Sequence, residues 1–316
     1  MKLNLPIIPQ LRGKKNILLA GMGGGFDIFC GVPLFFELRN MGFNVHLANF
    51  SFSDIENLRS GDRLSQTLVG VQYDINDLAI YFPELYLVQW FKEKFDQSIS
   101  IWCFQKTGAA PLLANYRLLV EHLAIDSIIL VDGGVDGLLR GDEEETGTLI
   151  EDSISLFAVN ELTHLSPRLI VCLGFGSEQN VSYTQVLENI AGLTKTGGFL
   201  GTCSLTPAMD AYRFYEEALL YTQGKPHQDP SVINSSVVSA ARGHFGNFHL
   251  TEKTKGNPLY ISPLMLLYWF FDLPTVARHH LFLPSLRETQ TFMQAVFEHI
   301  TTLRGVPRRV TPRIQF

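Results

Sequence analysis

The chain has 316 residues, of which 46% are hydrophobic and 18% are charged, and its formal net charge is −6. This length is sufficient for one large domain with a substantial hydrophobic core, and the small share of charged residues argues against long disordered segments. Non-specific binding of nucleic acid needs a basic surface, so the acidic balance argues against a nucleic-acid partner.

The cysteines and the apolar segments indicate where such a protein works. Cys103, Cys172 and Cys203 lie in apolar runs and no CxxC pair occurs, which predicts buried thiols rather than a zinc or redox site. The N-terminus lacks the apolar core of a signal peptide. No segment provides the roughly 18 apolar residues of a membrane helix, and Pro263 interrupts the longest candidate. We therefore expect a cytoplasmic protein with no membrane partner.

Apolar runs and helical patterns alternate along the first two thirds of the chain. The runs that predict strands cover residues 16–20, 43–50, 101–104, 127–132, 168–176 and 197–205. Apolar residues at three- and four-residue steps predict helices over residues 28–41, 81–95, 111–123, 183–195 and 211–222. Strands of continuous Ile, Leu and Val separated by helices are typical of a parallel sheet covered on both faces. Residues 14–222 therefore predict an α/β fold, a Rossmann-like, doubly wound, mostly parallel sheet with helices on both faces.

We assign the whole chain, residues 1–316, to a single α/β domain. Residues 223–260 are rich in Gly, Ser, His and Asn, and a long polar segment in a compact domain predicts a lid or an active-site loop. Residues 261–316 are predicted to form a C-terminal helical closure that includes a helix within residues 286–300. The final segment, RGVPRRVTPRIQF, carries four arginines and is predicted to be exposed to solvent.

The first predicted strand ends in a glycine-rich turn that contains Gly21, Gly23, Gly24 and Gly25. Free amides at the start of a helix attract anions, and glycines let a phosphate approach the backbone, so the turn predicts a phosphate- or cofactor-binding loop. The alternative is a tight strand–helix junction without a ligand. Asp27 follows directly. It is predicted either to contact a cation, a ribose hydroxyl or an amine of the ligand, or to cap the next helix.

This turn matches the dinucleotide-binding fingerprint only in part. Phe26 stands where the third glycine is expected, and the second strand ends near Asn49 and Ser51 rather than at an acidic residue. An NAD-like ligand and hydride transfer are therefore less favoured than a nucleotide or another phosphorylated ligand. No Lys-Ser/Thr pair follows the glycines, which excludes a P-loop.

An acidic loop, VDGGVDGLLRGDEEETG, follows the fourth predicted strand. Ligands of an open parallel sheet bind outside the carboxyl ends of its strands, so Asp132 and Asp136 are expected at the same edge as the glycine turn. These two aspartates could bind Mg²⁺, contact a ribose or act as a catalytic base. Glu143 is a further catalytic candidate, although a run of three glutamates is also typical of a solvated loop. Thr148 and Glu151 are spaced as a capping box.

Weaker signals lie elsewhere in the chain. Asp152 lies in the predicted helix after the acidic loop, on a face that could point back toward that loop. Gly134, Gly174 and Gly176 are predicted to line the ligand crevice, although the last two could also belong to an ordinary loop after the fifth strand. His244, in the polar segment, could deliver an imidazole to the substrate.

Three stretches together resemble a known family. AGMGGGFDIFCGVPLFFELRNMGFNVHLANFSF, VDGGVDGLLRGDEEETGTLIEDSISLFAV and VCLGFGSEQNVSYTQVLENIAGLTKTGGFLGTCSL occur in the order found in the prokaryotic family described as "domain of unknown function 1152". The resemblance covers residues 16–271 and implies a soluble, single-domain α/β protein with no settled activity. The positions to which the family pattern gives weight are Gly23, Gly24, Asp27, Asp132, Gly134, Asp136, Gly141 and Glu143.

Taken together, these features favour an enzyme, either a hydrolase or a group transferase, that binds a nucleotide or another phosphorylated metabolite as a small-molecule partner. The alternative is a non-catalytic nucleotide-binding sensor or regulatory subunit in which residues 223–260 close over the ligand. A third hypothesis is an assembly subunit whose phenylalanine-rich faces form a homo-oligomer. The convergence of several carboxylates on one edge favours the enzyme, because a sensor does not require them.

Overall fold

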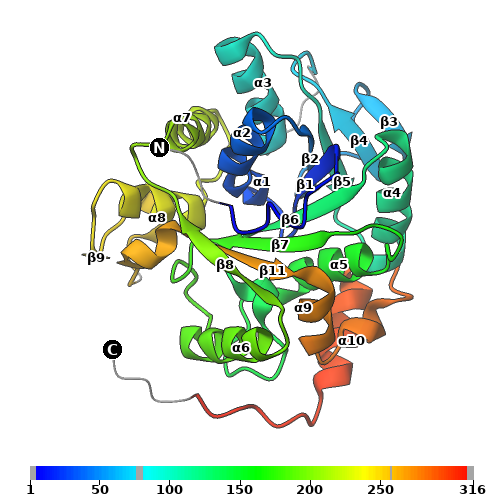
Figure 1. Cartoon of the computed structure of the whole chain (residues 1–316), viewed down its shortest axis with the longest axis vertical. Helices are drawn as coiled ribbons and strands as arrows, with labels where there is room; N and C mark the ends of the chain where they lie inside the picture. Colours follow the sequence, from blue (N-terminus) through cyan, green and yellow to red (C-terminus); the bar gives the residue numbers. More distant parts are fainter. Residues whose placement is uncertain (1–4, 76–80, 257, 312–316) are drawn as a thin grey trace.

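The computed structural model describes residues 5–75, 81–256 and 258–311. Its centre is a nine-stranded sheet with the order β3-β4-β5-β2-β1-β6-β7-β11-β8 (Figure 1). The strands of this sheet are β1 (Asn16–Gly21), β2 (Asn44–Ser51), β3 (Asp62–Ser65), β4 (Leu68–Val71), β5 (Ile101–Gln105), β6 (Ser127–Gly133), β7 (Arg168–Leu173), β8 (Phe199–Ser204) and β11 (Leu267–Asp272).

The central strands β5, β2, β1, β6 and β7 pair in parallel. Strand β1 lies between β2 and β6, so the chain moves outward from β1 first in one direction and then in the other. Ligands of such sheets bind outside the carboxyl ends of the strands at this point of reversal. Residues 17–20 of β1 are fully buried, as expected for a central strand that is covered on both faces.

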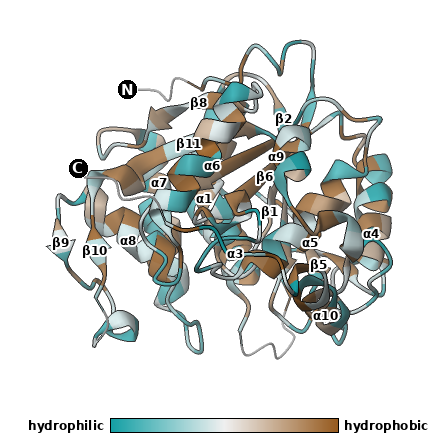
Figure 2. Ribbon diagram, turned by 90° about the horizontal axis from the view of Figure 1, so that it is seen from below, coloured by the Kyte–Doolittle hydropathy of each residue, from teal (hydrophilic) through white to brown (hydrophobic). Residues whose placement is uncertain are grey.

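Helices cover both faces of the sheet, and each face has its own apolar core. Ile17 and Leu19 of β1 point into one core, whereas Leu18 and Ala20 point into the other. The helices of the first face are α1 (Asp27–Cys30), α2 (Val32–Asn40), α3 (Pro83–Phe95), α7 (Asp210–Gln223) and α8 (Val232–Ala241). Those of the second face are α4 (Ala109–His122), α5 (Leu149–Asn160), α6 (Tyr183–Lys195), α9 (Leu273–His279) and α10 (Phe292–Leu303). The predicted α/β class with helices on both faces is therefore confirmed, and Figure 2 shows the apolar strands between them.

Two parts of the sheet depart from the prediction. Strands β3 and β4 form an antiparallel pair at one edge, in a stretch for which the sequence predicts no strand. Strand β11 is inserted antiparallel between β7 and β8, so the closure predicted as helical for residues 261–316 also contains a central strand. In β11, Tyr268, Phe270 and Phe271 are fully buried, because the strand packs against helices on both sides.

The polar segment 223–260 is not a continuous loop. It contains α8, a short 3₁₀ turn (Glu252–Thr254) and strand β9 (Gly246–Asn247), which pairs with β10 (Tyr260–Ile261). Val237 and Val238 of α8 are fully buried, so this helix is anchored in the core. Within the described ranges, no helix is long and apolar enough to cross a membrane.

Candidate functional site

A cavity of about 560 Å³ lies at the carboxyl ends of β1 and β6, where the sheet order reverses. The glycine turn after β1 and the acidic loop after β6 form one side of it, and residues of the polar segment complete it. The lining that concerns the chemistry comprises Gly23, Gly24, Gly25, Phe26, Asp27, Asp132, Asp136, Asp152, Asp229, Ser231 and Lys253. The sequence therefore correctly predicts that the glycine turn and the two aspartates border one crevice.

The glycine turn is shaped for close approach. A side chain at Gly23 would place its Cβ 2.5 Å from Oδ1 of Asp152 and 2.8 Å from Oδ2 of Asp27. Gly24 has a φ of +98° and packs directly against the ring of Phe52, so no other residue fits there without strain. The turn consequently brings backbone against carboxylates and an aromatic ring, in addition to bordering the cavity.

The amides of the turn differ in their availability. The amide of Gly23 donates a hydrogen bond of 2.6 Å to Oδ2 of Asp27, so it is not free to bind a ligand. Among the described residues, none accepts a hydrogen bond from the amides of Gly24, Gly25 or Phe26. The helix predicted over residues 28–41 breaks at Gly31, which leaves α1 with only four residues. Any anion at this turn would therefore be held by the free amides and not by a helix dipole.

Asp27, Asp132, Asp136 and Asp152 bring four buried carboxylates to the cavity. Asp132 is the last residue but one of β6, Asp136 begins a 3₁₀ turn, and Asp152 lies in the first turn of α5. The exposed fractions of the four residues are 9% for Asp27, 1% for Asp132, 2% for Asp136 and 1% for Asp152. One carboxylate oxygen each of Asp132, Asp136 and Asp152 lies within 4.8 Å of the others.

Hydrogen bonds from the protein orient two of these carboxylates, those of Asp132 and Asp136. Oδ2 of Asp132 accepts hydrogen bonds from the amide of Gly137 at 3.2 Å and from Sγ of Cys172 at 3.4 Å. Oδ2 of Asp136 accepts hydrogen bonds from the amide and the hydroxyl of Thr148, at 2.9 and 2.7 Å. The predicted capping box at Thr148 is therefore wrong, because its hydroxyl is directed to Asp136 instead of to the start of α5. Oδ1 of Asp152 is buried and has no hydrogen-bond partner among the residues that the structure describes.

The charge of the cluster is not balanced by the protein. No ion pair of the described chain involves any of the four aspartates. Burial and the charge of Asp136 raise the pKa of both Asp132 and Asp152 well above the ordinary value. Burial and the charge of Asp132 do the same to the pKa of Asp27. Ionising all four groups without a cation would be costly.

These raised pKa values predict how stability depends on pH. Above the ordinary aspartate value of 3.8, the ion-free folded protein holds protons that the unfolded chain has released. Its free energy of unfolding is therefore expected to fall as the pH rises through this window, by about 1.4 kcal/mol per pH unit for each extra proton held. Urea unfolding in EDTA from about pH 5 upward measures this fall. A free energy of unfolding that rises over the same range would contradict it.

The other predicted glycines lie near the cavity without lining it. Gly21 belongs to β1 and faces the side chain of Asn49, and the amide of Gly134 donates to the carbonyl of Leu173. Gly174 and Gly176 lie in the loop after β7. That loop borders an adjoining cavity of about 410 Å³, whose lining residues include Thr148, Ser177, Glu178, Ile233 and Lys253. Thr148, Ile233 and Lys253 line both cavities, so the two lie side by side.

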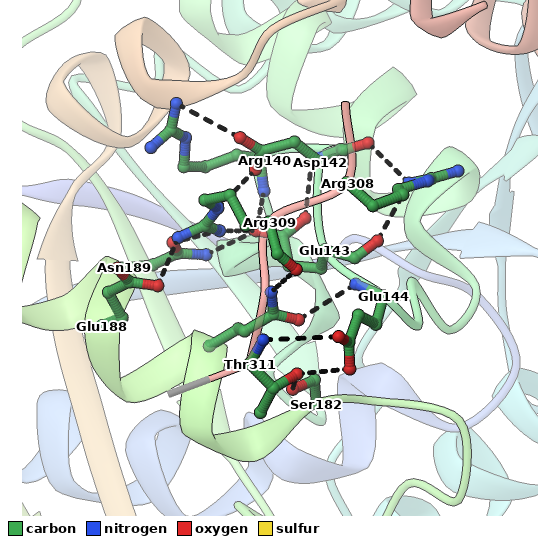
Figure 3. A network of polar contacts seen from close by, with 12 residues as sticks. Arg140, Asp142, Glu143, Glu144, Ser182, Glu188, Asn189, Arg308, Arg309 and Thr311 are labelled. Carbon is green, nitrogen blue, oxygen red and sulfur yellow. Dashed lines mark hydrogen bonds and ion pairs between the residues drawn. The ribbon is translucent and has the colours of Figure 1, made fainter. Parts of the chain in front are cut away.

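Glu143 lies outside the crevice, in the polar network drawn in Figure 3. Oε1 of this fully buried residue accepts a 2.7 Å bond from Arg309, and Asn189 donates to the same oxygen at 2.8 Å. Although burial opposes it, hydrogen bonds from the amide of Arg140 and from Asn189 lower the pKa of Glu143. The geometry thus gives Glu143 a structural environment and does not place it among the groups that face a ligand.

Most described residues of the tail are exposed to solvent, as the sequence predicts, and residues 312–316 lie outside the described ranges. The same network nevertheless binds the tail to the rest of the chain. Arg309 also bonds Asp142 at 2.8 Å and Glu188 at 2.7 Å, and Arg308 donates to two backbone carbonyls of the acidic loop. The tail is therefore bound across the loop between β6 and α5 (Figure 3). The ion pair between Arg309 and Glu143 joins residues 166 positions apart, which no local pattern reveals.

His244 likewise does not line the crevice. Its ring stacks on Phe248 with 3.6 Å between centroids, next to the β9–β10 pair. Other residues that do line it were missed by sequence reasoning, namely Phe52, Tyr81, Asp229, Ser231 and Lys253. The polar segment that contains the last three was recognised only as a whole, because the individual residues follow no motif.

The fold and the site together define a class of protein. It is an α/β protein whose crevice lies where the strand order reverses and combines a glycine turn with four buried aspartates. The family model described as "Protein of unknown function (DUF1152)" matches residues 18–303. The chain therefore belongs to this family, as the resemblance predicts. No match was found among curated proteins or among solved structures.

Proposed function

We propose that this protein is a hydrolase or group transferase that acts on a nucleotide or another phosphorylated metabolite bound in the crevice. The observation that carries the proposal is a set of four buried carboxylates that form no ion pair with any described residue, beside three backbone amides that have no described acceptor. Amides suit an anionic group, whereas carboxylates suit a cation, ligand hydroxyls or a proton in transfer. A purely structural acidic cluster would gain nothing from remaining unpaired.

In the proposed reaction, Gly24, Gly25 and Phe26 receive the anionic group through their amides. The oxygen of a water molecule or of an acceptor alcohol attacks the electrophilic centre, its proton passes to a carboxylate, and the bond to the leaving group breaks with its electron pair. Asp27 is suited to take the proton, because it lines the cavity outside the close trio of Asp132, Asp136 and Asp152. A raised pKa brings a carboxyl group nearer to the range of an efficient general base at neutral pH.

The alternative, a sensor that closes residues 223–260 over a nucleotide, has less support. Asp229, Ser231 and Lys253 of this segment do line the crevice. However, Asn234 of α8 donates to the carbonyl of Phe26 at 3.2 Å and accepts from Tyr215 at 2.9 Å. These buried bonds tie the start of α8 to the glycine turn, which favours a fixed wall over a mobile lid.

Replacing Asp27 with asparagine separates the two functions. A thermal-shift screen of nucleotides, dinucleotides and sugar phosphates, with and without Mg²⁺, first identifies a ligand for a turnover assay. For an enzyme, we expect Asp27→Asn, which removes the proposed proton acceptor, to lower turnover by at least about 100-fold, the usual scale for a lost acid–base group, while the variant still binds the ligand. The matched control is Asp210→Asn, on the exposed side of α7, which should leave turnover unchanged. Ligand binding without turnover in the native protein would support the sensor instead.

A further inference from the structure

We propose that Asp132, Asp136 and Asp152 form the binding site of a single divalent cation of the Mg²⁺ or Mn²⁺ type. As a cofactor of the reaction, this cation rests on the proposed function; as a bound ion, it stands on the geometry of the three side chains alone. The site adds Asp152 to the two aspartates that the sequence motif suggests as ligands.

The three carboxylates converge from three separate elements of the fold. Strand β6, the 3₁₀ turn that begins at Asp136 and helix α5 each direct one carboxylate to the same point, with one oxygen of each within 4.8 Å of the others. Glycines make this approach possible. A side chain at Gly137 would place its Cβ 2.9 Å from Asp132, and one at Gly147 would lie 3.0 Å from Asp136. At these two glycines the backbone therefore packs closely against the carboxylates.

The hydrogen bonds from the protein reach only one oxygen each of Asp132 and Asp136. The protein donors to Asp132 and Asp136 all reach Oδ2, so within the described residues the Oδ1 atoms have no donor. Oδ1 of Asp152 is buried and unpartnered, in a residue that is only 1% exposed. Buried polar atoms in native proteins are almost always paired. An unpartnered carboxylate oxygen beside two others is the arrangement that a cation completes.

The protein's own cations near the cavity are already engaged. Lys253, which lines the cavity, pairs with Asp229 at 2.6 Å, and Lys106 pairs at 2.8 Å with Glu151, which also lines it. Hard carboxylate oxygens without nitrogen or sulfur ligands suit Mg²⁺ or Mn²⁺. Sγ of Cys172 is directed at Asp132 as a donor and so does not alter this preference.

The position of the site also fits its use. The space that a side chain of Gly23 would fill lies 2.5 Å from Asp152, so the cation would be adjacent to the glycine turn. Mg²⁺ in enzymes is typically held by one or two carboxylates together with phosphate oxygens and water. A phosphorylated ligand on the amides of Gly24 and Gly25 could complete the coordination from the cavity side.

The test is direct titration of the ligand-free protein with Mn²⁺, followed by electron paramagnetic resonance of the free ion. The native protein is expected to bind one Mn²⁺, and Asp152→Asn is expected to weaken binding at least about tenfold, the smallest usual loss even for residues outside the first coordination shell. Asp136→Asn should have a similar effect. The matched control is Asp229→Asn, a carboxylate of the same cavity that is paired with Lys253, and it should change the affinity by less than about twofold.

Unfolding curves in EDTA confirm that each variant is folded before it is titrated. The inference is overturned if the native protein binds no Mn²⁺ up to about 1 mM, the weak end of the range for protein sites. It is also overturned if Asp152→Asn and Asp229→Asn bind the ion equally well. Because no ligand or turnover is involved, loss of this inference leaves the proposed function open. Conversely, Mn²⁺ binding with no response to any phosphorylated ligand would count against the function alone.

Discussion

The Asp152→Asn variant is expected to be more stable than the native protein in EDTA at neutral pH, with a free energy of unfolding about 1–3 kcal/mol higher. Asp152 is 1% exposed, has no ion-pair partner in the described part of the chain and lies close to two further carboxylates. A neutral amide of the same shape removes the cost of burying this charge and can donate to a neighbouring carboxylate. Most substitutions of buried residues destabilise, so an increase is a distinctive result.

Urea unfolding with and without Mg²⁺ measures this effect. With Mg²⁺ present, the native protein gains the binding free energy of the ion and the advantage of Asp152→Asn should shrink or reverse. Asp210→Asn, at an exposed position of α7, is the control and should behave like the native protein under both conditions. A variant that is less stable than the native protein in EDTA would show that Asp152 is paired by a group of the protein itself.

Removing the guanidinium of Arg309 should have a large effect of the opposite sign. We expect Arg309→Ala to lower the free energy of unfolding by about 2–4 kcal/mol, because it leaves the buried charge of Glu143 without its cation. The loss falls below the full cost of an orphaned buried charge, since Asn189 and two backbone amides still donate to Glu143. The same change also removes the ion pairs of Arg309 with Asp142 and Glu188.

Denaturant unfolding of three variants tests this prediction. Arg304→Ala, at an exposed position just after α10, should cost no more than about 0.5 kcal/mol. Arg309→Lys should recover only part of the loss, because an ammonium cannot reproduce the several donors that a guanidinium presents to different oxygens. Equal stabilities of the Arg304 and Arg309 variants would mean that the tail is not bound across the acidic loop in solution.

Much of the fold could be predicted because its central strands are continuous apolar runs. The predicted strand at 16–20 is β1, that at 127–132 is β6, and the helix predicted at 183–195 has the bounds of α6. The failures have physical reasons. Strand β11 follows Pro263 in an apolar stretch that shows no period, and only its partners β7 and β8 reveal it as a strand. Gly31 divides the helix predicted over residues 28–41, a break that apolar spacing alone does not signal.

The candidate site was predictable where a motif encodes the geometry of a strand end. Asp27, Asp132 and Asp136 are close in sequence to the ends of β1 and β6, and sheet topology alone brings them to one edge. For Asp152 the sequence predicts only a position in a helix from which the side chain could point back toward the acidic loop. Glu143 belongs to the same acidic motif, yet its partner Arg309 lies in a distant tail. The sequence therefore could not distinguish Glu143, which forms an ion pair, from the aspartates that line the cavity.

The most direct test concerns the central claim, that the glycine turn and the aspartate cluster border one ligand-binding cavity. The measurement is the thermal shift produced by a phosphorylated ligand with Mg²⁺ in the native protein, in Gly24→Ala and in Asp152→Asn. At a hundred times its dissociation constant, the ligand should stabilise the native protein by about 2.7 kcal/mol, and both variants should lose most of this shift. A ligand that stabilises either variant as much as the native protein would contradict the claim.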